Sequence, residues 1–250
     1  DQILKKLYPL FQKKCIKRKK VSGRPYGIST LENQLLCLLI YYRTYTTQLF
    51  IGFFFHVDDS TVSRTIRRLE PLLAKIVQIK KERKMSEKEL ETLIIDCTEQ
   101  PIRRPKKGQR KWYSGKKKRH TIKSEIVMDG DGKILKISKP RPGRIHDIEV
   151  RRKSDPLPPA KEILADSGYQ GLQTELPNIR LPIKKPKKKP LDRKSKLKNK
   201  QLSSERIVVE NKIGEMKVFQ ILAQTYRNTI HSYAIKTKIV AGMVNFKNGF

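Results

Sequence analysis

The stretch Leu93-Ile94-Ile95-Asp96 decides the fold, because a short apolar run ends there in a single carboxylate. A run of this length, rich in branched side chains, is typical of a buried strand. The stretch Ile163-Leu164-Ala165-Asp166 repeats the pattern. We therefore expect two neighbouring strands whose ends bring Asp96 and Asp166 together. A third carboxylate, Glu210, lies on a predicted late helix.

The charge of the chain is strongly one-sided. Its 250 residues carry 57 Lys and Arg against 24 Asp and Glu, which gives a formal net charge of +33. Such a surface repels itself unless it meets a polyanion, and nucleic acids are the commonest polyanions in a cell. The composition therefore indicates a nucleic-acid partner, but it does not separate an enzyme from a structural RNA-binding protein. The length allows one sizeable core and a smaller satellite domain.

Other global features exclude several classes of protein. No uninterrupted apolar run approaches 18 residues, so no membrane-spanning helix is expected. Cys15, Cys37 and Cys97 form no pair motif, which fits a reducing cytoplasm and excludes a zinc site of Cys and His. The chain begins Asp1-Gln2-Ile3-Leu4, which is neither a signal peptide nor an initiator methionine. We expect a truncated or processed N-terminus, which would remove a helix from the recognition module.

We expect three parts along the chain. Residues 1–27 form a basic N-terminal segment, which ends in the turn-prone Ser22-Gly23-Arg24-Pro25. Residues 28–85 form a helical DNA-binding module. Residues 90–250 form an α/β domain that carries the three carboxylates. A highly charged linker or exposed helix over residues 80–91 connects the last two parts.

The helical module is predicted from apolar spacing and capping residues. A largely buried first helix is indicated by Leu31, Leu35, Leu36, Leu38 and Leu39. Thr46 or Thr47 can cap a second helix over residues 48–55, which is rich in phenylalanine. Asp58-Asp59-Ser60 offers side-chain oxygens to cap a third helix.

The third helix is a candidate for DNA recognition. Val62, Ile66 and Leu69 have helical spacing and should face a core. The remaining faces carry Thr61, Ser63, Arg64, Arg67 and Arg68. A short helix, a brief turn and a capped helix with such side chains outward is typical of a helix-turn-helix. An amphipathic helix with a solvated basic face explains the pattern too, so both interpretations stay open. Pro71 fits if it begins or kinks a further helix over residues 72–79.

The later part of the chain changes to the period of strands. Residues 120–128 predict a strand, residues 129–132 a tight turn, and residues 133–138 the returning strand of a hairpin. Asp129 and Asp131 are expected to shape that turn rather than bind a metal. Together with the two short strands and the late helix, the hairpin predicts a mixed sheet covered by helices.

Two basic tracts interrupt the α/β domain. Ten of the seventeen residues over 103–119 are Lys or Arg, and so are ten of the eighteen over 183–200. Runs of like charge do not pack with one another, so both tracts should be loops or mobile arms. A solvated solubility tail is the alternative. Trp112, Tyr113 and Gly115 lie among the cations of the first tract, and rings in such a place suit contact with bases or sugars.

The three carboxylates suit phosphodiester chemistry. Cleavage needs an activated water or hydroxyl and neutralisation of the phosphate charge, and two divalent ions about 3.5–4 Å apart supply both. Mg²⁺ or Mn²⁺ takes oxygen ligands, and a few carboxylates suffice because water and substrate supply the rest. Asp96, Asp166 and Glu210 are therefore candidate metal ligands and catalytic residues.

The late helix predicted over residues 207–222 carries Glu210 in a stripe with two basic residues. Arg206, Glu210, Gly214 and Lys217 align along one stripe of the helix. Gly214 leaves space beside the carboxylate, and the two cations are placed to grip flanking phosphates. An ordinary exposed ion pair between Arg206 and Glu210, worth about 0.3–0.5 kcal/mol, is the competing interpretation.

Several ordered motifs resemble those of bacterial insertion-sequence transposases of the DDE type, in the broad group that includes Harbinger-like elements. The late helix has that group's arginine, then glutamate after three residues, then lysine after six more: Arg206, Glu210 and Lys217. Many members carry a tyrosine where this chain has Ser203, so the resemblance supports no tyrosine contact to phosphate. Further similar stretches lie at residues 94–98, 113–120, 142–147 and 165–171. The resemblance runs from about Ile28 to the C-terminus.

The resemblance implies a ribonuclease-H-like mixed sheet with flanking helices, preceded by a small helix-turn-helix module. It implies Asp96, Asp166 and Glu210 as ligands of two Mg²⁺ or Mn²⁺ ions. The module would recognise the terminal inverted repeats of an element. The reaction would be hydrolysis at the element ends, followed by attack of the freed 3′-hydroxyl on target DNA.

Partners follow from the same resemblance. We expect double-stranded DNA, a homodimer on that DNA, no membrane and no nucleotide cofactor, in a bacterial cytoplasm and on the nucleoid when bound to DNA. The candidate DNA-binding residues are Ser60, Thr61, Ser63, Arg64, Arg67, Arg68, Lys116, Lys117, Lys118, Arg119, Arg206 and Lys217.

Some alternatives stay open. His146 and Asp147 could assist proton transfer or orient a ligand, or Asp147 could cap a helix that begins near Ile148. His56, His120 and His231 have no partner visible in the sequence and are expected to be structural. A nuclease or resolvase that joins no strands, and a silent DNA-binding protein derived from a transposase, are the competing functions.

Overall fold

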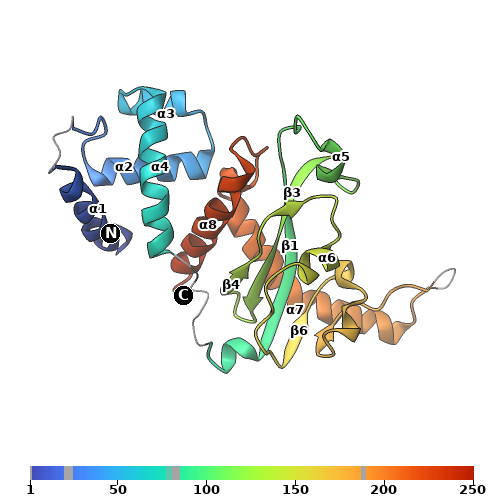
Figure 1. Cartoon of the computed structure of the whole chain (residues 1–250). Helices are drawn as coiled ribbons and strands as arrows, with labels where there is room; N and C mark the ends of the chain where they lie inside the picture. The colour runs from blue at the N-terminus through green and yellow to red at the C-terminus, as the bar shows by residue number, and fades with distance from the viewer. Residues whose placement is uncertain (1, 20–24, 78, 80–84, 187–189) are drawn as a thin grey trace.

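A computed structural model of the protein describes residues 2–19, 25–77, 79, 85–186 and 190–250, with the backbone alone at 14–19. Its N-terminal part is a group of four helices (Figure 1). They are α1 (Gln2–Lys19), α2 (Leu31–Thr44), α3 (Gln48–Phe55) and α4 (Asp59–Ile76). The predicted helices α2, α3 and α4 are confirmed. The α1 helix is not among the predicted elements, and its Leu7 is fully buried.

Capping explains where these helices begin. Thr30 accepts a hydrogen bond from the Asn33 amide at 3.2 Å, and Thr47 accepts one from the Phe50 amide at 3.2 Å. Each satisfies an amide that the first turn of a helix leaves unpaired. Asp58 is the N-cap of α4, but its side chain caps no backbone amide. The α4 helix also runs on through Pro71, so the separate helix expected over residues 72–79 is wrong.

The C-terminal part is built on one mixed sheet. Its strands are β1 (Thr92–Pro101), β2 (Tyr113–Ser114), β3 (Arg119–Asp129), β4 (Ile134–Ile137), β5 (Arg141–Pro142), β6 (Glu162–Leu164) and β7 (Ile179–Arg180). The order is β2-β3-β1-β6-β7, with β4 and β5 paired to β3. Strand β1 runs antiparallel to β3 and parallel to β6. The predicted hairpin is confirmed, since the Asp129 carboxylate accepts from the Lys133 amide at 2.9 Å and shapes the turn.

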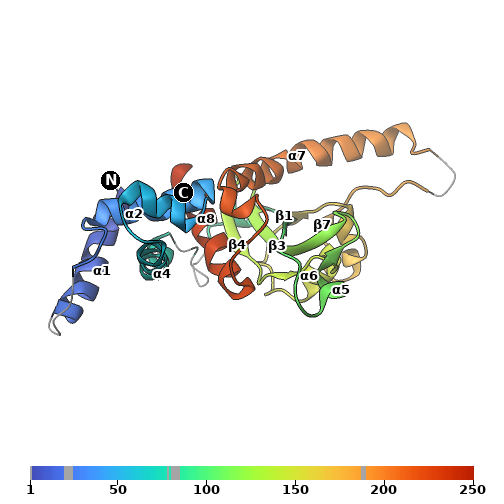
Figure 2. The same ribbon diagram turned by 90° about the horizontal axis from the view of Figure 1, so that it is seen from above.

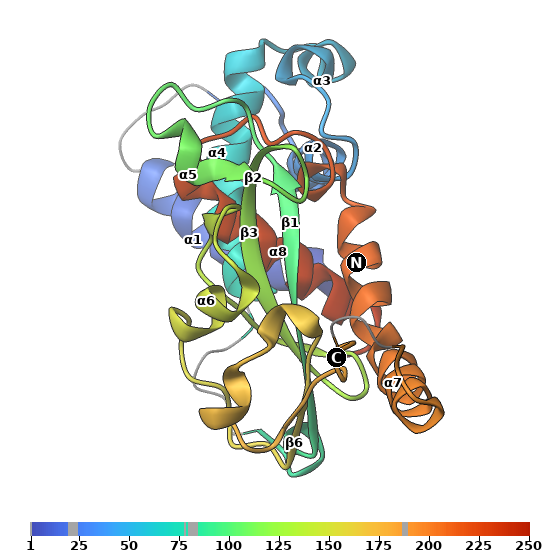
Figure 3. The same cartoon turned by 90° about the vertical axis from the view of Figure 1, so that its right-hand side faces the viewer.

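Helices cover both faces of this sheet (Figure 3). The long helices are α7 (Arg193–Lys217) and α8 (Tyr233–Lys247), and the short ones are α5 (Gln109–Trp112) and α6 (Asp147–Arg152). Single turns of 3-10 helix are η1 (Lys88–Leu90), η2 (Ser167–Tyr169), η3 (Leu172–Thr174), η4 (Gln220–Leu222) and η5 (Ile230–Ser232). One core joins α7, α8 and the N-terminal helices to one face of the sheet. A smaller core, which includes Tyr169 and Leu172, fills the other face.

Several expectations fail in detail. The tract over residues 183–200 is not wholly a loop, because α7 begins at Arg193 and is capped by Asp192, which accepts from the Ser195 amide at 3.2 Å. The tract over 103–119 is not wholly a loop either, because it contains α5 and β2. Trp112, the last residue of α5, packs against the core. Leu36, expected in the core, is 45% exposed. The α8 helix was not anticipated.

Three predicted features fall partly outside the described residues. These are the turn at 22–25, the linker over 80–91 and the middle of the tract over 183–200. In the described part of the chain, no helix has both the length and the apolar character that crossing a membrane requires.

A buried polar cluster connects the N-terminal helices to the sheet domain. The Lys236 ammonium of α8 donates to the Glu70 carboxylate of α4 at 2.6 Å, and the Tyr42 hydroxyl donates to the same carboxylate at 3.0 Å. Both charged residues are buried. A buried charge is tolerated only when it is paired, so each partner fixes the other. The cluster thus holds α2, α4 and α8 in one arrangement.

Replacing Lys236 by Ala should leave Glu70 buried without its cation and lower the free energy of unfolding by about 3–5 kcal/mol. Urea unfolding of the purified chain measures this change. Lys238→Ala is the matched control, because Lys238 is on the same helix and exposed. Equal effects of the two substitutions would contradict the role given to the cluster.

Candidate metal and nucleic-acid site

The register of two parallel strands brings the two predicted aspartates together. Ile94 of β1 pairs with Leu164 of β6, and both side chains lie in the core beneath α7 and α8. The residues on either side of them point into the core on the opposite face: Leu93, Ile95, Ile163 and Ala165. Side chains alternate along extended backbone, so Asp96 and Asp166, two positions further on, lie on the face of Ile94 and Leu164. Asp166 follows the end of β6, but Asp96 lies in the middle of β1, so the expectation that Asp96 ends its strand is wrong.

Local hydrogen bonds fix both carboxylates. Asp96 Oδ1 accepts from the Cys97 amide at 2.8 Å, and Asp166 Oδ1 accepts from the Gly168 amide at 2.8 Å. A Cβ atom on Gly168 would lie 2.6 Å from Asp147 Oδ2 and 3.0 Å from Asp166 Oδ1. Only glycine therefore lets the backbone approach these two carboxylates. Asp147 becomes the third acidic group beside the site.

The negative charge of Asp96 is only partly compensated by its surroundings. Burial raises its pKa to about 6, Arg206 opposes that shift, and the Asp166 carboxylate adds to it. Arg206 Nη2 lies 3.9 Å from Asp96 Oδ2, which is too long for a hydrogen bond. In the described part of the chain, the buried Nε of Arg206 also lacks a hydrogen-bond partner. Asp96 and Arg206 therefore face each other without forming a hydrogen bond.

Glu210 lies on α7, one turn beyond Arg206, and is exposed. Lys217, at the end of the same stripe, lies within electrostatic range of Asp96. Burial and Lys117 lower the pKa of Lys217, while the Asp96 carboxylate opposes this shift. Among the residues that the structure describes, no three His, Cys, Asp or Glu side chains come together to hold a metal ion. The structure thus brings Asp96 and Asp166 together, and it does not gather Glu210 with them.

The donor set fits a divalent cation in part. Two neighbouring aspartates with oxygen donors suit Mg²⁺ or Mn²⁺, which complete their shells with water and substrate. A cation between them would offset the burial that raises the pKa of Asp96, and the long contact to Arg206 leaves Asp96 Oδ2 accessible to it. A further oxygen ligand could come from Asp147, which lies beside Asp166 across Gly168, or from Glu210 if α7 moved.

Asp147 does not cap a helix as one alternative supposed. The α6 helix begins at Asp147 itself, with His146 at the N-cap position. The Asp147 carboxylate instead accepts from Lys123 Nζ of β3 at 2.8 Å, and the same ammonium donates to the Ile145 carbonyl at 3.1 Å. Lys123 therefore anchors the loop that carries His146 and Asp147 to the sheet.

A buried polar cluster behind this loop was missed from the sequence. Arg151 of α6 is hydrogen-bonded to the Glu125 carboxylate of β3, and both side chains are buried. The Tyr169 hydroxyl contacts Cys97 Sγ at 3.3 Å. The available signal was the presence of two charged residues, Lys123 and Glu125, in the middle of a predicted strand.

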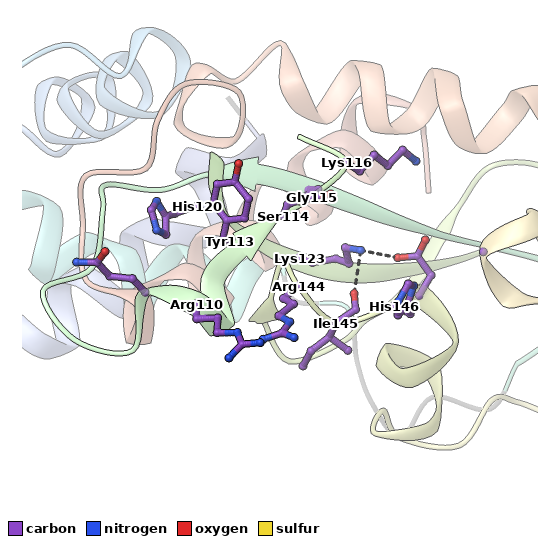
Figure 4. A pocket seen from close by; sticks show the side chains of 15 residues that line it. Arg110, Tyr113, Ser114, Gly115, Lys116, His120, Lys123, Arg144, Ile145 and His146 are labelled. Atoms are coloured by element: carbon purple, nitrogen blue, oxygen red, sulfur yellow. Dashed lines mark hydrogen bonds and ion pairs between the residues drawn. The ribbon is translucent and has the colours of Figure 1, made fainter. Parts of the chain in front are cut away.

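An open cavity of about 850 Å³ lies beside Asp147 and Gly168, and neither Asp96 nor Asp166 is part of its lining (Figure 4). Its walls are the loops around Tyr113 and His146 and the side chains of His120 and Lys123 on β3. Cations of the lining are Arg110, Lys116, Lys123 and Arg144. His120, expected to be structural, lines the cavity and packs edge-on to Tyr113 with ring centroids 5.7 Å apart. The cavity thus combines cations with rings, as contact with nucleotides requires.

Three further cations of the first tract directly follow the lining residue Lys116 in the chain. Lys117, Lys118 and Arg119 are exposed, and Lys118 has a left-handed backbone with φ of 52°. The Lys117 amide donates to Ser114 Oγ at 3.2 Å, which tightens the turn between β2 and β3. The side chains are therefore carried on an ordered turn.

On α4 the predicted recognition residues divide into two groups. Ser60, Arg64 and Arg67 are exposed, and Arg64 donates to Thr61 Oγ1 at 3.0 Å. Thr61 and Ser63 are half-buried. Arg68 does not point outward as expected. Its guanidinium donates to Gln34 Oε1 at 2.8 Å and lies 3.7 Å from the centre of the Tyr26 ring.

Comparison with known families agrees with this architecture. The sequence profile of DDE superfamily endonucleases matches residues 95–245, and that of the helix-turn-helix of these endonucleases matches residues 30–78. The chain belongs to the DDE endonuclease superfamily. This membership and the mixed sheet confirm the predicted fold class, a ribonuclease-H-like domain after a small helix-turn-helix module.

Two curated relatives of this DDE family member are transposases by name. It is 34% identical to the probable transposase for insertion sequence element IS702 of Microchaete diplosiphon, over 92% of this chain and 85% of the relative. It is 29% identical to the putative transposase for insertion sequence element IS112 of Streptomyces albus G, over 63% of this chain and 59% of that relative.

Asp96→Asn should stabilise the protein at pH 7 in a chelator. The folded pKa of Asp96 is raised from 3.8 to about 6, so folding binds this proton more tightly than the unfolded chain does. The aspartate therefore costs nothing below about pH 4, and its cost grows as pH rises through 6. We expect the asparagine variant to gain about 1–3 kcal/mol at pH 7. Urea unfolding at pH 4 and pH 7 measures the gain, and a gain that does not increase with pH contradicts the assignment.

Proposed function

We propose that this DDE family member is a DNA transposase that binds terminal inverted repeats, cuts at the element ends and joins the freed ends to target DNA. The observation that carries the proposal is that Asp96 and Asp166 follow the paired residues Ile94 and Leu164 on one face of the sheet, where Arg206 of α7 lies 3.9 Å from Asp96. Such a pair beside a cationic cavity suits chemistry on a phosphodiester.

Asp96, Asp166 and Glu210 would hold the divalent cations, Mg²⁺ or Mn²⁺. When bound, two such ions activate the attacking oxygen and neutralise charge on the phosphate. The protein's own residues do the rest. Gly168 leaves room for the Asp147 and Asp166 carboxylates to approach its backbone, and Lys123 holds Asp147 on the sheet.

The DNA path follows the positive charge. Lys116 and Arg144 flank the cavity, and Lys117 lies near Lys217 of α7. The α7 helix continues beyond the sheet as a basic extension (Figure 2). Cations along one line bind successive phosphates without reading the sequence. Recognition of the repeats is assigned to the exposed residues of α4.

The proposed protein partner is a second copy of the chain. Transposition joins two ends, so two copies act together on DNA. The protein works in the cytoplasm, on the nucleoid when bound, and needs no nucleotide cofactor because strand transfer exchanges one phosphodiester for another.

One observation favours a second candidate, a DNA-binding protein without catalysis. Glu210 is not gathered with the two aspartates in the part of the chain that the structure describes. The substitutions below separate the two functions.

Asp96→Asn, Asp166→Asn and Glu210→Gln should each reduce Mg²⁺-dependent cleavage of terminal-repeat DNA by at least about 100-fold, because each removes a charge on a metal ligand. Cleavage of a labelled duplex measures this. Glu205→Gln is the matched control, since Glu205 lies on α7 and pairs with Arg180 at 3.1 Å. Full activity in any of the three variants would remove that residue from the ligand set.

Joining is tested separately, with pre-cut ends and a supercoiled target. A transposase yields strand-transfer product, whereas a nuclease or resolvase of the same fold yields none. Binding of the repeats without either reaction would leave the silent DNA-binding protein.

Arg64→Ala and Arg67→Ala should each cost about 1–3 kcal/mol of discrimination between terminal-repeat and random DNA, if each contacts a base edge. Competition binding at fixed salt measures the ratio of affinities. Lys75→Ala removes a charge from the last turn of the same helix and should weaken both affinities alike. Unchanged discrimination in the two arginine variants would move recognition to another element.

A further inference from the structure

The α3 helix exposes an apolar face that the proposed chemistry does not use. Its sequence, QLFIGFFF, contains no charged residue. Four of its side chains are 59–80% exposed: Leu49, Phe50, Phe53 and Phe54. In Figures 1 and 3, α3 lies at the outer end of the helical group, away from the sheet. We call these four side chains the α3 patch.

The α3 patch is one continuous surface. At about 100° per residue, its four side chains span an arc of about 140° on the helix. The opposite side carries the buried Ile51 and Gly52. A Cβ atom on Gly52 would lie 2.4 Å from the Val57 carbonyl, so the inner side is closely packed against the turn into α4. Turning the helix to bury the patch would therefore break this packing.

The charge around the patch sets it apart from the rest of the chain. Residues 44–63 contain no Lys or Arg, and they include Asp58 and Asp59, in a chain of net charge +33. This is the longest stretch of the sequence without a basic residue. Two copies of so basic a protein repel each other, and they can approach most closely where the cations are missing.

We propose that the α3 patch is the interface through which two copies of this chain associate, each α3 packing against its counterpart about a two-fold axis. Aromatic side chains bury about 150–250 Å² each, so the exposed fractions correspond to roughly 500 Å² per copy. A standard interface takes about 800 Å² per partner, with an apolar centre and a polar rim. Thr47 and His56, both exposed beside the patch, supply part of such a rim.

This interface would hold together the two copies that act on DNA in the proposed function. Its biological role rests on that function, but its existence does not. It places the two recognition helices on either side of the axis, because α4 follows α3 after a short turn. Two helix-turn-helix modules related by a two-fold axis suit two repeats in opposite orientation.

The double substitution Phe53→Ser with Phe54→Ser tests the interface. Sedimentation equilibrium of the nuclease-treated chain should show a monomer–dimer equilibrium, and the double variant should raise its dissociation constant at least about 30-fold. Association of the wild-type chain should strengthen between 0.1 and 0.5 M salt, since salt screens the repulsion of the basic surfaces. Association through residual nucleic acid would weaken instead.

Leu197→Ser is the matched control, because Leu197 is 60% exposed and lies on α7, far along the chain from α3. It should dimerise like the wild type, and circular dichroism should show all variants folded. A wild-type chain that stays monomeric overturns the proposal, whether another protein or a further segment covers the patch. A dimer that the double variant retains, or that the control also loses, overturns it equally.

The test is independent of the catalytic assignment. The double variant should keep the wild-type affinity for a single duplex end at equal monomer concentration. If the wild-type chain dimerises through α3 but cuts no DNA, the proposed function fails and the interface stands.

Discussion

The parallel register of β1 against β6 is the constraint on which the candidate site depends. Pairing of Ile94 with Leu164 places both aspartates on one face of the sheet, Asp96 within β1 and Asp166 just after β6. Slipping the register by one residue would turn one carboxylate into the opposite core. The two cores make such a slip costly, because each strand has branched side chains on both faces. The same apolar packing that stabilises the sheet therefore positions the acidic pair.

The acidic pair is in turn defined by the cations around it. Burial and the neighbouring carboxylate raise the pKa of Asp96, while Arg206 faces it at 3.9 Å without a hydrogen bond. Such an arrangement stores an unfavourable charge that a bound cation would relieve. In the proposed function, positive side chains of the cavity lining and of α7 would bind the phosphate backbone near the acidic pair. In this account α7 carries both the cations for DNA and the third carboxylate, so DNA binding and completion of the site are coupled.

The elements with a clear apolar period could be predicted from the sequence. The first half of β1, the strand β6, the hairpin turn at Asp129 and the helices α2, α3 and α4 follow from local spacing and capping. The continuation of β1 from Asp96 to Pro101 does not, because its residues are mostly polar. The α1 and α8 helices could not, because α1 is rich in basic residues and α8 is apolar on most sides, so neither shows a clean stripe. The inward turn of Arg68 and the ion pair of Lys123 with Asp147 depend on residues far apart in the chain, which no local pattern reveals. Nor could spacing show whether Glu210 reaches the aspartates.

The most direct measurement is the anomalous diffraction of Mn²⁺ in crystals of the protein bound to a duplex with a pre-cut repeat end. We expect a manganese peak between Asp96 and Asp166, within about 2.2 Å of an oxygen of each, with Glu210 brought in by α7 as a further ligand. A peak that involves neither aspartate, or a Glu210 carboxylate that stays more than about 10 Å from the ion with DNA bound, would contradict the account.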